Sequence, residues 1–319
     1  LRFQDMDLPG AHLSSTASDQ NAKTTQLTFT DAVDLYVKLK GRGKPDTFAR
    51  SAHRANDYLE GCCGRKDLAD LKRADAIKLR DHLIRKGLVG SSIARIFTTI
   101  KAVLNFVIAE MDLDLKNPFR GVYLDKSQGV SERQPIPLRN IRVIQAECFK
   151  LDDDIRWAIA LLSDTGMRLA EVIGLATEDI KLKSPTPYIH LKAHPWRPLK
   201  TISSERYIPL VGAALWAATR IKDAQSQTFA FPRYTSSEIC NANSASGALN
   251  KWLKPMTPAG CTIHSFRHSM RDRLRAAQCP SDVIDQIGGW AAYSVGERYG
   301  NGYQLSVLSE WLTSAMVGN

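Results

Sequence analysis

Four side chains near the C-terminus are of the kinds that can together break a phosphodiester bond. An imidazole and a guanidinium lie three positions apart, and an indole and a phenol follow at a separation of nine positions. A site that cleaves a phosphodiester needs a nucleophile and fixed donors around the phosphate oxygens. The four residues are His264, Arg267, Trp290 and Tyr299. Their types and order predict breakage and rejoining of DNA strands.

Two kinds of segment must position these side chains. Phe29, Val33 and Tyr36 begin a helical period, for which Thr30 and Asp31 offer an N-cap. Helical periods in the first half also extend over residues 45–60, 74–86 and 91–110. The second half is predicted to form helices over residues 138–149, 154–164, 211–224, 244–254, 264–277, 281–287, 291–299 and 304–316, with short strands over 179–182, 188–191 and 206–210. The fold class is therefore α+β and mostly helical, with a small antiparallel sheet.

Composition shifts along the chain predict the domain boundaries. Residues 1–25 are polar without an apolar period, so we interpret them as a flexible N-terminal segment. Residues 26–122 form the helical domain, which ends after Asn117-Pro118-Phe119 because proline disfavours helix at the preceding residue. Residues 123–137, rich in turn formers, are the predicted linker, and 138–319 form the catalytic domain with a C-terminal helix.

The charge distribution favours a polyanionic partner. The net charge is +10 and the pI is about 9.3. Residues 26–125 hold 18 Lys and Arg against 13 Asp and Glu, and residues 126–319 hold 23 against 17, so both halves are basic. A protein that grips one duplex from two sides would show this distribution, although basic helices are also common as solvated faces. The candidate DNA-binding residues of the helical domain are Arg50, Arg54, Arg95 and Lys101.

Cysteine usage and hydropathy bound the remaining classes. The six cysteines show no repeated C-x-x-C, so neither a zinc site nor a disulfide framework is predicted. No window approaches the roughly 18 to 20 uninterrupted apolar residues that span a bilayer. We expect a cytoplasmic protein without a metal or cofactor, associated with the nucleoid when bound to DNA.

The motifs taken together resemble the tyrosine recombinase, or phage integrase, family. They are Leu162-Ser163-Asp164-Thr165-Gly166-Met167-Arg168-Leu169-Ala170-Glu171, Leu199-Lys200-Thr201, Arg206-Tyr207-Ile208-Pro209-Leu210, His264-Ser265-Phe266-Arg267-His268, Gly288-Gly289-Trp290 and Tyr299. Each motif alone is weak, whereas this order and spacing over residues 138–319 are specific. The preceding helical segment resembles the family's core-DNA-binding domain, so the resemblance covers nearly everything after residue 25.

The resemblance implies a role for each charged residue. Arg168 and Arg267 match the family's two arginines, whose guanidinium groups hold the nonbridging phosphate oxygens. Alone, Arg168 could equally be a helix-start residue that pairs with Glu171, which itself matches a supporting acid. Lys200 matches the lysine that protonates the leaving 5′ oxygen, with Lys192 as a rival candidate. His264 matches an acid-base group near the tyrosine.

The aromatic positions complete the comparison. Trp290 departs from the commonest pattern, which has histidine there, and an indole can donate a hydrogen bond but cannot shuttle a proton. Tyr299 matches the nucleophile because of its nine-residue distance from Trp290, a distance that Tyr293 and Tyr303 do not share. Its attack would leave a 3′-phosphotyrosyl bond that stores the energy for rejoining, so the reaction would need neither ATP nor metal.

The sequence therefore predicts a site-specific recombinase, an integrase of a phage or other mobile element, acting on double-stranded DNA. The resemblance implies a clamp of two domains, a homotetramer on two synapsed sites and a monomer when free. Two alternatives stay open: a type IB topoisomerase or telomere resolvase with the same chemistry, and a non-catalytic DNA-binding regulator. The C-terminal stripe Leu305, Leu308, Trp311, Leu312 and Ala315 would dock onto a neighbouring protomer or pack on its own domain.

Overall fold

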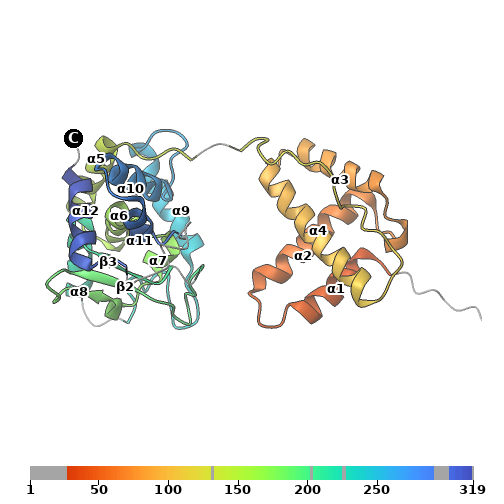
Figure 1. Cartoon of the computed structure of the whole chain (residues 1–319), viewed down its shortest axis with the longest axis horizontal. Coiled ribbons are helices and arrows are strands. Elements are labelled where there is room, and N and C mark those ends of the chain that lie inside the picture. The colour runs from red at the N-terminus through yellow and green to blue at the C-terminus, as the bar shows by residue number, and fades with distance from the viewer. Residues whose placement is uncertain (1–26, 131–132, 202–203, 225–227, 291–301, 318–319) are drawn as a thin grey trace, which may run out of the picture. The chain divides into compact units, whose positions relative to one another are not determined.

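The computed structural model divides the chain into two compact units, residues 1–130 and 131–319 (Figure 1). It describes residues 27–130, 133–201, 204–224, 228–290 and 302–317. The division falls within residues 123–137, where the sequence predicts a linker. Parts of that stretch pack on the units: the Gly90 amide donates to the Gln128 carbonyl at 2.7 Å within the first unit, and Ile136 is buried in the core of the second.

The first unit is built from helices. They are α1 (Phe29–Lys40), α2 (Asp46–Cys63), α3 (Arg73–Arg85) and α4 (Gly90–Glu110), with the 3-10 turn η1 (Leu68–Asp70) between α2 and α3. The N-cap of α1 is Thr28, two residues before the predicted one. Thr28 accepts from the Asp31 amide, and Asp31 accepts from the Thr28 amide at 2.8 Å. This reciprocal capping box leaves Thr30 inside the helix, where its hydroxyl donates to Glu60 at 2.6 Å.

Helix α4 forms the centre of the first unit. Its length and mean hydropathy would suffice to cross a membrane, a result that the sequence prediction did not anticipate. The helix nevertheless carries Arg95 and Lys101, and one of its faces packs against α1, α2 and α3. The buried residues on that face are Ile93, Phe97, Ile100, Val103, Leu104 and Val107. We therefore interpret α4 as the core helix of this unit.

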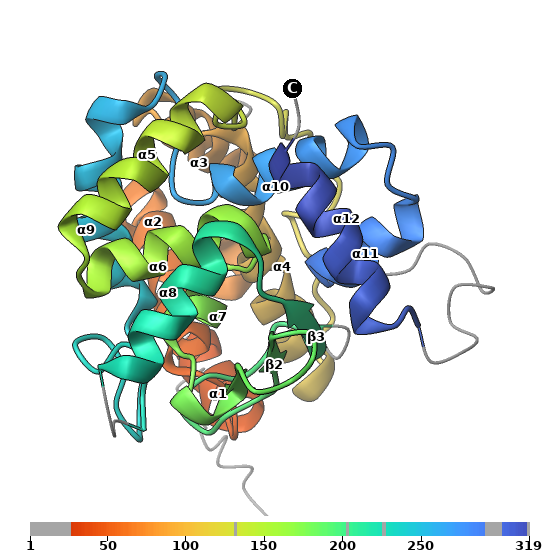
Figure 2. The ribbon, with the colours of Figure 1, turned by 90° about the vertical axis from the view of Figure 1, so that its left-hand side faces the viewer.

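The second unit surrounds the buried helix α6. Its helices are α5 (Leu138–Leu151), α6 (Asp154–Thr165), α7 (Leu169–Ile173), α8 (Gly212–Asp223), α9 (Ala242–Leu253), α10 (Ser265–Ala276), α11 (Ser281–Gly288) and α12 (Leu305–Val317), with the 3-10 turns η2 (Thr177–Asp179) and η4 (Lys254–Met256). Helix α6 packs against α5, α8 and α10 (Figures 1 and 2). Its last eight residues are all buried, which gives the helices around it a common core.

Three short strands form the small antiparallel sheet. They are β1 (Ile180–Lys181), β2 (Tyr188–Leu191) and β3 (Arg206–Pro209), in that spatial order. Ile189 pairs with Ile180 on one side and with Ile208 on the other, and all three side chains are buried. The connection from β2 to β3 carries Lys200, as the sequence predicts.

Helix α12 packs on its own unit in this structure. Leu308, Leu312 and Ala315 are buried in a cluster with residues of α10 and α11. The helix packs against α10 and β3 (Figures 1 and 2). Of the two placements that the sequence left open for this helix, the structure therefore shows packing within the same chain. The predicted helix 291–299 lies outside the described residues.

Candidate catalytic site

A sharp turn places Arg168 at the start of α7. Helix α6 ends at Thr165, and Gly166 takes a left-handed conformation with φ of 63°. A side chain at Gly166 would be strained by that φ and would bring its Cβ to 3.1 Å from Met270. Arg168 is the N-cap of α7, and its Nη1 donates to Glu171 Oε1 at 2.6 Å. The local pairing foreseen as an alternative is present, and it fixes the guanidinium in place.

Glu171 connects Arg168 to a second arginine, Arg206. The sequence shows Arg206 within a family motif, but no catalytic role was assigned to it from the sequence. Arg206 on β3 is buried, and its Nη2 donates to Glu171 Oε2 at 3.1 Å. Burial alone would raise the pKa of Glu171, but Arg206 and the hydrogen bonds from Arg168 outweigh it and hold that pKa below its ordinary value. Glu171 is therefore an anion at neutral pH that orients two guanidinium groups.

Arg206 also binds the backbone of α11 and of the segment before β3. Its Nε donates to the Ile287 carbonyl at 2.9 Å and its Nη1 to the Ser204 carbonyl at 2.8 Å. A side chain at Gly289, where φ is 61°, would bring its Cβ to 2.7 Å from Arg206 Nη1. Arg206 thus joins β3, α7 and the end of α11. The sequence contained a signal for this role: Arg206 shares one face of a short predicted strand with the apolar Ile208, and a charged residue at such an inward position needs a partner.

Helix α10 presents the second predicted arginine to the same place. Arg267 Nη1 donates to the Gly166 carbonyl at 2.6 Å, in the turn before Arg168. Its Nη2 is buried without a hydrogen-bond partner among the residues that the structure describes. Burial, followed by the nearby Arg168 and Arg206, lowers the pKa of Arg267 to about 9. The group still carries its charge at neutral pH, and it forms no ion pair among the described residues.

His264 is the N-cap of α10, one turn before Arg267. Its side chain is half-buried, and burial lowers the pKa of the imidazole, with further contributions from Arg133, His268 and Arg267. The histidine is therefore neutral at pH 7. A neutral imidazole can accept a proton from a phenol or donate a hydrogen bond to a phosphate, depending on the tautomer.

Trp290 contacts two arginines of α10. The guanidinium carbon of Arg267 is 4.1 Å from the ring centroid, and that of Arg271 is 4.8 Å away. Such cation–π contacts orient both the ring and the guanidinium groups. A side chain at Gly288 would overlap the indole, with its Cβ at 1.7 Å from a ring carbon. Trp290 is thus part of the cluster formed by Arg168, Arg206 and Arg267, which we call the arginine cluster. The absence of a side chain at position 288 makes that placement possible.

The structure distinguishes the two candidate lysines. Lys192 Nζ is 2.9 Å from Glu178 Oε1 and 3.7 Å from Asp179 Oδ1, so its charge is already balanced. Lys200 is exposed, and no hydrogen bond or ion pair involves it within the described part of the chain. Its neighbour Thr201 lies 2.9 Å from Ser204, whose hydroxyl accepts from Arg168 Nη1 at 3.1 Å. These contacts favour Lys200 as the group that serves the site.

Of the candidate tyrosines, only Tyr303 lies in the described residues. Its hydroxyl donates to Asp282 at 2.5 Å, and this bond raises the pKa of the phenol. Its backbone is also fixed, because the Tyr303 amide donates to Gln286 at 2.8 Å. A tyrosine held in this way is a poor nucleophile. Tyr299 and Tyr293 fall in residues 291–301, outside the described residues.

The candidate DNA-binding residues lie in the first unit. Arg50 and Arg54 on α2 and Arg95 on α4 are exposed, and Lys101 is half-buried. The face of α2 that packs into the core consists instead of Ala52, Ala55, Asn56 and Leu59. The three arginines are therefore free to contact an external polyanion.

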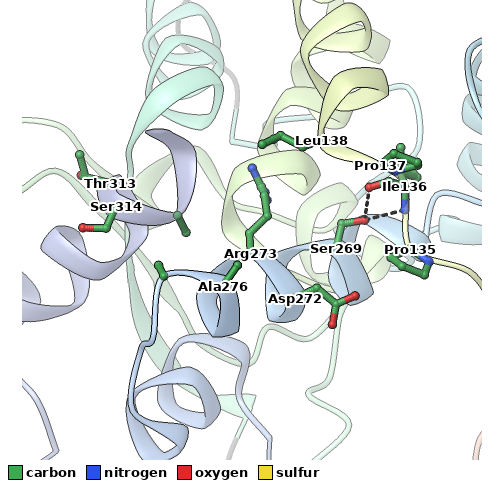
Figure 3. A pocket seen from close by; sticks show the side chains of 12 residues that line it. Pro135, Ile136, Pro137, Leu138, Ser269, Asp272, Arg273, Ala276, Thr313 and Ser314 are labelled. Atoms are coloured by element: carbon green, nitrogen blue, oxygen red, sulfur yellow. Dashed lines mark hydrogen bonds between the residues drawn. The ribbon is translucent and has the colours of Figure 1, made fainter. Parts of the chain in front are cut away.

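A cavity of about 800 Å³ lies elsewhere in the second unit, and its lining includes none of the predicted catalytic residues that the structure describes (Figure 3). It is lined by residues of α10 and α12 and by the segment around Pro137. Figure 3 shows how Ser269 holds that segment, because its hydroxyl accepts from the Ile136 amide at 2.7 Å. The cavity therefore belongs to the packing of the unit and not to the arginine cluster.

Comparison with known proteins gives a consistent family. The profile of the phage integrase family matches residues 140–304. The tyrosine recombinase XerC of Psychromonas ingrahamii is 25% identical over 236 residues, which cover 68% of this chain and 72% of XerC.

Solved structures agree in fold. The Tn1549 transposon integrase, residues 82–397, in complex with circular intermediate DNA has a TM-score of 0.65 at 19% identity and covers 89% of this chain and 99% of its own. A lambda integrase dimer bound to a COC′ core site has a TM-score of 0.63 at 15% identity, covering 90% and 95%. A lambda integrase tetramer bound to a Holliday junction has a TM-score of 0.65 at 15% identity, and the match covers 88% of this chain and 84% of that integrase chain.

Proposed function

Because the chain belongs to the phage integrase family of tyrosine recombinases, enzymes of site-specific DNA recombination, we propose that it works through a covalent 3′-phosphotyrosyl intermediate formed by Tyr299. The phenolic oxygen of Tyr299 attacks the scissile phosphorus, and a bond forms between them. The bond from phosphorus to the 5′ oxygen breaks, and the departing oxygen takes a proton from Lys200. Rejoining reverses these steps with a 5′ hydroxyl as the nucleophile.

The observation that carries this proposal is the uncompensated charge of the arginine cluster. Among the described residues, Glu171 pairs with Arg168 and Arg206, and Arg267 forms no ion pair. The three guanidinium groups therefore carry two positive charges more than Glu171 balances. The buried Nη2 of Arg267 also lacks a hydrogen-bond acceptor among the described residues. A transition state at phosphorus that gathers negative charge supplies both the charge and the acceptors. The cluster is thus suited to stabilise pentacoordinate phosphorus.

The remaining side chains take the proton-transfer and orienting roles. The lowered pKa of His264 keeps its imidazole neutral and able to accept the proton of Tyr299. Trp290 contacts the guanidinium groups of Arg267 and Arg271 through its ring and orients both. It takes no part in proton transfer, because an indole N–H only donates.

The biological context is proposed from the relatives. The matched structures are integrases of a transposon and of phage lambda in complex with DNA. By analogy, this chain recombines the DNA of a phage or other mobile element as a tetramer on two duplexes, in the cytoplasm of its host. The basic surface of the first unit supports DNA binding by both units.

Trapping of a covalent adduct tests the proposed chemistry. The substrate is a nicked duplex that covers the DNA flanking the gene, so that the short 5′ product diffuses away after cleavage. The wild-type enzyme should form a protein–DNA adduct, and Tyr299→Phe should form none while still binding the duplex. Tyr303→Phe is the matched control, and it should retain the adduct because Tyr303 is engaged with Asp282.

The same experiment separates the alternatives. An adduct that survives in Tyr299→Phe would contradict the assignment of the nucleophile. Rapid relaxation of supercoiled DNA without a preferred site would indicate a topoisomerase that uses the same chemistry.

A further inference from the structure

The connection between β2 and β3, which carries Lys200, is attached to the C-terminal end of α7. Residues 194–197 form a tight turn in which the His194 and Arg197 backbones exchange hydrogen bonds of 3.1 and 3.0 Å. Trp196 Nε1 and Arg197 Nε both donate to the carbonyl of Gly174, at 3.0 and 3.1 Å. Gly174 is the C-cap residue of α7, the helix that Arg168 begins.

This turn is fixed by several further contacts. His194 Nε2 lies 2.8 Å from Asp179 Oδ2, and its ring stacks on Trp196 with centroids 4.5 Å apart. The indole of Trp196 also meets Phe229 edge-on at 4.9 Å. Arg197 is only 2% exposed, and its Nη2 donates to the Lys192 carbonyl at 2.8 Å. These contacts join the turn to α7, to η2 and to Lys192, the residue that follows β2.

The close approach of the turn to α7 depends on a glycine. A side chain at Gly174 would bring its Cβ to 2.4 Å from Arg197 Cδ and 2.9 Å from Arg197 Cβ. The backbone φ of Gly174 is −89°, so other residues could adopt its conformation. A glycine is therefore needed at position 174 to leave room for Arg197, and not to allow an unusual backbone conformation.

The same connection is attached again on the far side of Lys200. Ser204 accepts from Arg168 Nη1 at 3.1 Å, and Thr201 lies 2.9 Å from Ser204. The connection is thus tied to both ends of α7, at Gly174 and at Arg168. Lys200 lies between the two attachments, three residues after Arg197.

We propose that the turn formed by His194, Trp196 and Arg197 is a positioning device that sets Lys200 at the leaving oxygen of the reaction. The inference rests on the proposed role of Lys200 as the proton donor. A general acid acts only within hydrogen-bond reach of the atom that it protonates. An ammonium on a flexible stem keeps that reach only if its backbone is held. In this role Trp196 and Arg197 act through Lys200.

The test compares two substrates that differ in their need for an acid. One nicked duplex has the ordinary 5′ bridging oxygen at the scissile phosphate, and the other has sulfur there. A thiolate leaves without protonation, because a thiol has a pKa of about 8.5, far below the pKa of an alcohol. In single-turnover cleavage, Trp196→Phe removes the indole N–H and should slow the oxygen substrate about tenfold or more. The sulfur substrate should be slowed by no more than about twofold.

The variants include matched controls. Trp216→Phe makes the same replacement at a half-buried tryptophan of α8 and should leave both rates unchanged. Gly174→Ala forces the turn away from α7 by steric contact and should reproduce the selective loss seen in Trp196→Phe. Thermal unfolding of each variant identifies any loss that comes from unfolding, since unfolded protein loses both activities equally.

The outcomes distinguish this inference from the proposed function. One outcome would overturn the inference alone: Lys200→Ala regains its cleavage rate on the sulfur substrate, but Trp196→Phe and Gly174→Ala cleave both substrates equally slowly. The turn would then have only a structural role. If Lys200→Ala is equally slow on both substrates, the acid role of Lys200 fails, and the inference fails with it. If the wild-type enzyme forms no adduct on either substrate, the proposed function itself is wrong.

Discussion

Arg168 and Arg267 differ in how much of their charge is balanced before any ligand arrives. Arg168 has a carboxylate partner in Glu171, whereas Arg267 donates to one carbonyl and is surrounded by other cations. Both face the same turn at residues 166–168, although they come from helices about 100 residues apart in sequence. At the residue scale, the excess positive charge of these side chains, oriented by the carboxylate of Glu171, therefore favours the binding of an anion.

Replacing Arg168 should affect catalysis more than DNA binding. Arg168→Ala should slow single-turnover cleavage about 100- to 1,000-fold, because a fixed donor to the transition state is removed. Its affinity for the duplex should change by less than about threefold, since many other cations contact DNA. Arg233→Ala is the control, because Arg233 forms an exposed pair with Asp154 in the same unit. Equal losses in binding and cleavage would count against a transition-state role.

The acid limb of the pH–rate profile should report His264. The pKa of His264 lies below its ordinary value near 6.5, because burial, together with the nearby Arg133, His268 and Arg267, disfavours the protonated imidazole. The neutral, active form should therefore persist below pH 6.5, and cleavage should fall only at lower pH. His264→Gln should be slower and should lack this inflection. An inflection at or above pH 6.5 in the wild-type enzyme would contradict the assignment.

At the scale of the elements, short segments are held in place by buried polar side chains. Helix α7 has only five residues, and β3 has four, so neither is stable by itself. Arg206 joins both of them to the carbonyl of Ile287 in α11. Three parts of the catalytic site therefore share one buried guanidinium, and we expect them to move or unfold together.

Removal of Arg206 should destabilise the whole catalytic unit. Arg206→Met leaves Glu171 buried with less compensation, and the free energy of unfolding should fall by about 3–5 kcal/mol. Arg220→Met is the matched control, because Arg220 pairs with Asp152 at 2.5 Å on the surface, and its removal should cost less than about 1 kcal/mol. Urea unfolding followed by tryptophan fluorescence measures both values. Similar decreases in the two variants would show that Arg206 has no special structural role.

At the scale of the whole molecule, the two units have different duties. The second unit contains the arginine cluster, and the first contributes a basic helical surface. Residues 1–130 hold 21 Lys and Arg against 16 Asp and Glu, and residues 131–319 hold 22 against 17, so each unit has a surplus of five positive charges. Binding of DNA by both units would bring the duplex to the cluster without any basic tail.

Charge removal on α2 should weaken DNA binding in a salt-dependent way. If Arg50 and Arg54 each neutralise a phosphate, Arg50→Ala/Arg54→Ala should lower the slope of log affinity against log salt by about 0.9 for each of these phosphates. Lys78→Ala/Arg85→Ala removes two exposed cations from α3 and is the matched control. Fluorescence anisotropy over a salt series measures the slopes. Equal slopes for the two double variants would favour the alternative that the α2 cations are only a solvated face.

The sequence by itself determined the family, the fold class and the order of the chemical groups. Helical periodicity and the spacing of the motifs depend on neighbours in the chain, and for that reason the predicted helices and strands in the described residues agree with the structure to within a few residues. The N-cap of α1 was misplaced because Thr28 and Thr30 are both capping residues, and only the reciprocal bonds with Asp31 identify the first.

The tertiary structure decided which of several similar side chains are already paired and which stay available. Lys192 and Lys200 are alike in sequence, but the acids that occupy Lys192 come from the segment before β1. Arg206 looks like an ordinary strand residue until Glu171 and Ile287 meet it from distant parts of the chain. Side chains far apart in sequence acquire their partners only through folding, so charge compensation, burial and the resulting pKa values follow from the packing and not from the local pattern.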